Sequence, residues 1–179
     1  QGDDRLYSLL VFNNSFGGTM SSRLFQKIRE ENGLAYSVYS YPASYNGAGM
    51  FGIYAGMSPS QVEKVLSLII QEINLVKKEG LTEYELMKAK EQLKGNYILG
   101  LESTSSRMNG LGKSELLLGY IKTPEQILNE VDAVTVEKVS DTINTVLNTD
   151  KISVSLVGKL PRNVTLKKIT TMIDDALSV

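Results

Sequence analysis

Two neighbouring segments of this chain change from a helical to a strand-like spacing, and this change limits the folds that the chain can adopt. The segments are "LAYSVYSYP" and "GAGMFGIYAGM", which are rich in Tyr, Val, Ile and Phe, and Asn46-Gly47 lies between them. An Asn-Gly pair in this position predicts a β-hairpin. Pro42 limits how far the first strand can pair as a central strand, because proline has no N–H to donate.

Helical patterns lie on both sides of the predicted hairpin. Before it, the spacing of apolar residues predicts one helix over residues 5–16 and a second over residues 21–31. After it, further helices are predicted by capping-box patterns that begin at Ser58, Thr82 and Thr123, and by helical spacing over residues 100–119, 136–147 and 165–179.

A third strand is predicted in "KISVSLVG", where Ile152, Val154 and Leu156 alternate with polar residues. Strands and helices do not alternate regularly, so we expect an α+β fold: an antiparallel β-sheet covered on one face by α-helices. Residues 1–179 suit a single domain. Three strands are few for this much helix, and a strand upstream of Gln1 would explain the difference.

The sequence contains no histidine and no cysteine. This excludes a zinc site with imidazole or thiolate ligands and any catalytic triad that needs histidine. The formal net charge is −1, from 19 basic and 20 acidic residues, which argues against a dedicated nucleic-acid surface. No apolar run approaches the roughly 20 residues of a membrane-spanning helix. We therefore expect neither a nucleic-acid partner nor a membrane partner.

Arg29 and Tyr36 stand seven residues apart in the sequence, on either side of a turn predicted at Gly33. In one interpretation Arg29 only complements the dipole at a helix C-terminus and Tyr36 only packs as a strand aromatic. In the other, a guanidinium and a phenol both donate hydrogen bonds to one acceptor, such as a carbonyl that becomes an oxyanion. Residue types and spacing leave both interpretations open.

Two other patterns give weaker indications of a site. The "GGTMSS" segment lacks the Gly-Lys-Ser/Thr ending of a phosphate-binding loop and follows a predicted helix, so it is interpreted as a helix–helix link. The acidic residues form no metal-binding loop signature. We interpret them as parts of solvated helix faces. The residues considered are Glu30, Glu31, Asp132, Asp174 and Asp175.

The segment "FGGTMSSRLFQKIREENGLAYSVYSYPASYNGAGMFGIYAGMSP" resembles the C-terminal half of the pitrilysin/insulinase family of zinc metallopeptidases. The similarity is to the bacterial branch that resembles mitochondrial processing peptidase. It continues through "LKGNYILGLESTSSRMNGLG" to "ISVSLVG" and so covers nearly the whole chain. The resemblance implies a half-domain of the processing-peptidase-like metallohydrolase fold, from a longer peptidase with two homologous halves.

The resemblance also implies a division of labour between the halves. In such families the N-terminal half carries an H-x-x-E-H motif that holds zinc and activates water, and the C-terminal half supplies an Arg and a Tyr to the substrate backbone. The matching residues here are Arg29 and Tyr36. The implied function is the substrate-binding half of a zinc-dependent endopeptidase acting on peptides or small proteins. Zinc would be bound by the other half, with no metal ligand in this chain, and this chain alone would be inactive.

The alternative is a non-catalytic structural subunit with the same fold, acting as a scaffold in a complex. The expected partners are a peptide substrate and a homologous N-terminal half or partner subunit. An unpaired sheet edge and an uncovered apolar face also favour self-association of the chain as a homo-oligomer. The expected location is cytoplasmic.

Overall fold

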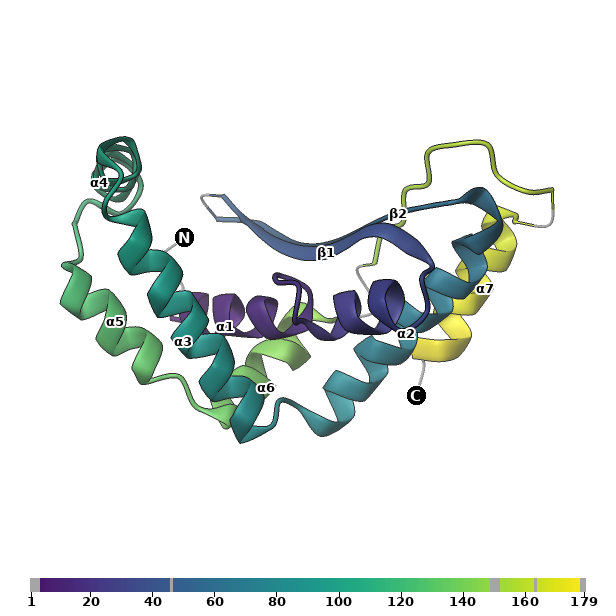
Figure 1. Ribbon diagram of the computed structural model, residues 1–179, viewed down its shortest axis with the longest axis horizontal. Helices are drawn as coiled ribbons and strands as arrows, with labels where there is room; N and C mark the ends of the chain where they lie inside the picture. The colour runs from purple at the N-terminus through teal and green to yellow at the C-terminus, as the bar shows by residue number, and fades with distance from the viewer. Residues whose placement is uncertain (1–3, 46, 149–151, 163, 178–179) are drawn as a thin grey trace.

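The computed structural model describes residues 4–45, 47–148, 152–162 and 164–177. Figure 1 shows a long hairpin of two strands that crosses a layer of helices, with α1, α2 and α6 on the same side of it. In chain order the elements are α1 (Leu6–Phe16), the π-helix η1 (Phe25–Glu30), β1 (Ala35–Ser44), β2 (Gly49–Met57), the short 3-10 helix η2 (Pro59–Gln61), α2 (Val62–Glu79), α3 (Glu83–Gly100), α4 (Thr104–Leu118), α5 (Pro124–Asp132), α6 (Val136–Val146) and α7 (Leu166–Leu177). The predicted α+β class, with helices covering one face of an antiparallel sheet, is confirmed.

The predicted hairpin forms, and it is longer than expected. β1 and β2 pair antiparallel, and the first strand continues past Pro42 to Ser44. Pro42 stands opposite Phe51 within the paired region. Both strands of a two-stranded sheet are edge strands, so a residue without an N–H can be accommodated there.

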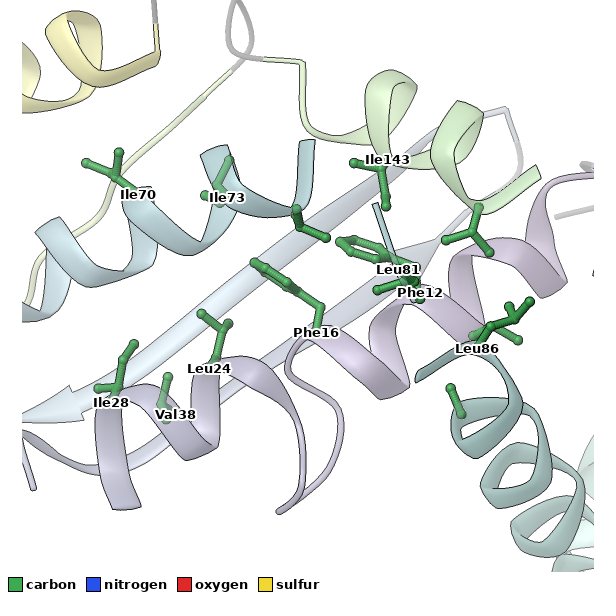
Figure 2. Close-up of a cluster of buried hydrophobic side chains, with 14 of the residues drawn as sticks. Phe12, Phe16, Leu24, Ile28, Val38, Ile70, Ile73, Leu81, Leu86 and Ile143 are labelled. Carbon is green, nitrogen blue, oxygen red and sulfur yellow. The ribbon is translucent and has the colours of Figure 1, made fainter. Parts of the chain in front are cut away.

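The core lies between the inner face of the hairpin and the helices beneath it. Phe12 and Phe16 of α1 stack with their ring centroids 5.1 Å apart, and the ring of Phe51 from β2 lies 5.4 Å from that of Phe12. Figure 2 shows Leu24 and Ile28 from the next helical segment in the same cluster. The core therefore connects α1, η1 and the hairpin directly.

The helix predicted over residues 21–31 forms, but with a different hydrogen-bonding pattern. Residues 25–30 are π-helical, and the N–H of Glu31 donates to the carbonyl of Gln26 at 2.9 Å. A single π-helical turn is rare and frequently marks a functional site. Leu24 and Ile28 are fully buried, as the predicted apolar face requires.

Two of the three predicted capping boxes form. The side chains of Thr82 and Thr123 accept hydrogen bonds from the third residue of α3 and α5, and the reciprocal bonds are present. Ser58 makes no side-chain cap, because the chain first forms η2 and α2 begins only at Val62. Within the described residues, no helix combines the length and the apolar character needed to cross a bilayer.

The predicted third strand is wrong for the residues that the structure describes. Residues 152–157 do not pair with any strand in the described part of the chain. Lys151 lies outside the described residues. A cavity of about 310 Å³ is lined by this segment, β2 and α2. Because a strand needs a hydrogen-bonded neighbour, apolar alternation alone does not make one. Ile152 and Val154 remain partly exposed.

Candidate functional site

Tyr36 occupies a β-bulge at the start of β1. Ala35 pairs with Met57 and Ser37 with Gly56, so that Tyr36 has no partner in β2. A bulge adds one residue to a strand and re-aims the side chain at that position. Tyr36 is accordingly 85% exposed, whereas Ala35 beside it is buried.

Arg29 lies next to Tyr36, as the interpretation in which both side chains face one ligand expects. The guanidinium carbon is 5.6 Å from the centroid of the Tyr36 ring and 4.9 Å from that of the Phe25 ring. Both distances are within the range of cation–π attraction. The structure therefore brings the two predicted site residues together and adds Phe25, which lies four residues before Arg29 in the same helix.

The turn between η1 and β1 accounts for this meeting. Gly33 has a φ of 60°, in the left-handed region that glycine adopts most readily. Its N–H donates to the carbonyl of Arg29, and the N–H of Leu34 donates to the carbonyl of Ile28, both at 3.0 Å. These bonds close the turn and return the chain past the end of η1. The predicted role of Gly33 as the helix stop is confirmed.

The strand that carries Tyr36 is fixed to the end of α1. The N–H of Ser40 donates to the carbonyl of Gly17 at 3.0 Å, and the Ser40 hydroxyl donates to Oδ1 of Asn13 at 2.8 Å. Ser40 is buried, so both bonds are protected from water. Gly17-Gly18 thus forms the link between helices that the sequence predicts. The same link also contacts β1 through the backbone bond to Ser40.

The guanidinium of Arg29 and the hydroxyl of Tyr36 can donate hydrogen bonds to a ligand. In the described part of the chain Arg29 makes one ion pair, with Glu30 at 4.0 Å, and no hydrogen bond; its side chain is 40% exposed. A guanidinium offers a planar fork of N–H donors and a phenol offers one O–H donor. Such a pair of donors suits a carbonyl or carboxylate oxygen.

Zinc does not fit the residues that the structure describes. The sequence lacks histidine and cysteine, and the described residues include no cluster of three metal-ligating side chains. Three of the acidic residues considered from the sequence have cationic neighbours: Glu30 lies 4.0 Å from Arg29, Glu31 pairs with Lys27 at 2.9 Å and Asp132 pairs with Lys94 at 2.8 Å. The Asp175 side chain lies outside the described part of the structure.

Sequence reasoning missed two features near the site. Phe25 was not proposed as a site residue, and its spacing of four from Arg29 was the available signal. Arg23 was not singled out, although its side chain forms a bidentate ion pair with Glu85. The two residues are 62 positions apart, and nothing in a single sequence connects them.

Comparisons with known proteins agree with this architecture. A family model described as the peptidase M16 inactive domain matches residues 1–93. An uncharacterized zinc protease of Bacillus subtilis, YmxG, is 50% identical over 139 residues, which are 78% of this chain. An uncharacterized zinc protease of Streptomyces coelicolor is 44% identical over 158 residues, or 88% of this chain.

A solved structure is similar as well. The crystal structure of a peptidase M16 inactive domain from Pseudomonas fluorescens superposes with a TM-score of 0.74 at 27% identity, over 82% of this chain and 35% of that one. The chain spans 34% of the length of each of the two curated relatives. It therefore corresponds to about a third of such a protein.

Proposed function

This chain belongs to the peptidase M16 family, and from that premise we propose that it is the substrate-binding half of a zinc-dependent endopeptidase. The part of the family that it matches is the inactive domain. The hydrolytic chemistry is therefore assigned to the remainder of a longer protein. The observation that carries the proposal is the meeting of Arg29 and Tyr36 at an exposed bulge, where the guanidinium has one ion pair among the described residues, with Glu30 at 4.0 Å.

The proposed ligand is the backbone of an extended peptide. Arg29 and Tyr36 hydrogen-bond a substrate carbonyl, and they hold it more tightly as negative charge develops on the oxygen. Donors placed in advance at such a position contribute roughly 3–4 kcal/mol each to the transition state. Phe25 restricts the guanidinium from one side, so that little rotamer freedom is lost when the peptide binds.

Zinc and the activated water are assigned to a homologous half outside this sequence. The chemistry of the side chains supports this assignment, because no group of three or more metal-ligating side chains lies together among the described residues. The names of the relatives, which are zinc proteases, support the presence of zinc in the longer protein. The peptide would bind between the two halves.

The test is steady-state cleavage of a library of quenched-fluorescence peptides by the full-length protein. Tyr36→Phe deletes one hydroxyl at an exposed position and should lower kcat/KM roughly a hundredfold with an unchanged melting temperature. Arg29→Lys should also lower it strongly, because an ammonium does not reproduce the planar fork. Tyr45→Phe, at another exposed tyrosine of the hairpin, is the control and should leave kcat/KM unchanged.

Unchanged kinetics in the variants would contradict the proposed function. If kcat/KM stays at the wild-type level in both Tyr36→Phe and Arg29→Lys, the two residues do not bind substrate. If the unmodified full-length protein cleaves no peptide of the library, the assignment to an endopeptidase fails. The chain would then be assigned to the alternative, a structural half with the same fold.

A further inference from the structure

Arg23 stands at the start of the helical segment that carries Arg29, and its side chain reaches across to another part of the fold. Nε donates to Oε1 of Glu85 at 2.6 Å and Nη2 donates to Oε2 of Glu85 at 2.7 Å. Nη2 also donates to the carbonyl of Gly80 at 3.1 Å. The two charged side chains are only 16% and 25% exposed. A bidentate pair of this kind has a defined geometry as well as a favourable energy.

Glu85 is itself held in place. Its Oε2 accepts hydrogen bonds from the backbone N–H and from the hydroxyl of Thr82, each at 2.9 Å, in the capping box of α3. Burial raises the pKa of the Glu85 carboxyl, but the hydrogen bonds from Arg23 and Thr82 outweigh burial and keep that pKa below its ordinary value. One carboxylate therefore connects the start of η1 to the junction of α2 and α3.

The side chains of this segment point to three different surroundings. Leu24 and Ile28 are fully buried in the core. Arg23 reaches the α2–α3 junction, while Phe25 and Arg29 lie against each other and Arg29 against the Tyr36 ring. Arg23 and Arg29 thus lie on opposite flanks of the apolar contact. The apolar contact and the backbone bonds at Gly33 and Leu34 hold the C-terminal side of this segment, and the contact of Arg23 with Glu85 and Gly80 is a polar anchor on its N-terminal side.

We propose that Arg23 is a positioning residue that, through its bidentate contact with Glu85, fixes the rotation of η1 and thereby holds the Arg29 guanidinium beside Tyr36. The proposal rests on the proposed function, since it concerns the placement of a substrate-binding group. It assigns no contact with substrate to Arg23 itself. A displacement of about 1 Å at a reacting group can cost a hundredfold in rate, so a modest rotation of η1 has a measurable effect.

The experiment is a double-mutant cycle on the full-length protein with the same quenched-fluorescence peptide library. Arg23→Gln should lower kcat/KM by about tenfold or more in the wild-type background. In the Arg29→Lys background, where the positioned group is already altered, the same change should cost less than about twofold. Arg23→Lys, which keeps the charge and loses the bidentate fork, should fall between wild type and Arg23→Gln.

Lys27→Gln is the matched control, because Lys27 forms an exposed ion pair with Glu31 on the same helix and takes no part in the contact with Glu85. It should leave kcat/KM unchanged. Hydrogen exchange gives a readout that is independent of activity: backbone amides of residues 25–31 should exchange faster in Arg23→Gln, while those of α5 and α6 should not change.

The outcomes distinguish failure of the positioning role of Arg23 from failure of the proposed function. If Arg29→Lys and Tyr36→Phe are costly but the losses from Arg23→Gln and Arg29→Lys simply multiply, Arg23 does not act through Arg29 and this inference is overturned alone. Unchanged exchange over residues 25–31 in Arg23→Gln overturns it as well. If Arg29→Lys and Tyr36→Phe are themselves without effect, the proposed function fails, and the positioning role fails with it.

Discussion

Gly17 has no room for a side chain, because the strand that carries Tyr36 approaches it closely. A Cβ at this position would lie 2.5 Å from Oγ and 2.6 Å from the backbone N of Ser40. Gly17→Ala should therefore lower the free energy of unfolding of the full-length protein by about 1–3 kcal/mol, the usual cost of overpacking. Urea unfolding with thermal melts would measure it.

The matched control for Gly17→Ala is Gly95→Ala in the interior of α3, where a Cβ meets nothing within 4 Å. Alanine favours a helix over glycine by about 1 kcal/mol, so this variant should be as stable as wild type or more stable. Equal stability of Gly17→Ala and wild type would contradict the close contact between α1 and β1.

The residues of the site were identified only in part from the sequence. Arg29 and Tyr36 were singled out by spacing and then by resemblance, and their contact is confirmed; their role toward substrate stays a prediction. The bulge was not anticipated. Its signal is the interval of three between buried Ala35 and buried Val38, where strict alternation would give two.

Two similar capping patterns, Ser58-Pro59-Ser60-Gln61 and Thr123-Pro124-Glu125-Gln126, had different outcomes. Thr123 caps α5, whereas Ser58 caps no helix. Thr123→Ala should lower the free energy of unfolding by about 1 kcal/mol, and Ser58→Ala should change it by less than about 0.5 kcal/mol. Urea titrations of both variants would decide, and equal losses would show that the cap at Thr123 does not matter.

The elements were predicted best where local chemistry is sufficient. The hairpin around Asn46-Gly47 and the helices opened by Thr82 and Thr123 formed as expected. Asn46 itself lies outside the described residues. The π-helical pairing of η1 and the unpaired state of residues 152–157 depend on packing and on neighbouring strands. The periodicity of apolar residues predicts neither the π-helical hydrogen bonds nor the absence of a strand partner.

For the whole molecule, the chain by itself should not hydrolyse peptides. It has no histidine or cysteine, and its described residues hold no metal-binding cluster, so added zinc should not produce activity. The measurement is a fluorescent peptide assay on the purified 179-residue chain, with and without zinc and chelator. Chelator-sensitive cleavage by the pure chain would refute the assignment of hydrolysis to another part of the protein.

The fold class and family of the whole molecule followed from the sequence, and the comparisons confirm the family. Self-association of the isolated chain stays a prediction. The cavity of about 310 Å³ beside β2 is lined by apolar side chains that include Phe51 and Ile53. The division of labour between two halves cannot be derived from a chain that covers 34% of its relatives.

The bulge makes Tyr36 an insertion in its strand and leaves it outside the ladder of pairs. The pairs on either side, Ala35 with Met57 and Ser37 with Gly56, would become consecutive if Tyr36 were removed. Loss of a single codon would then delete the phenol and keep every other pair, and gain of one codon would restore it. The pairing of the hairpin therefore does not depend on Tyr36, and one codon decides whether the strand carries the phenol that faces Arg29.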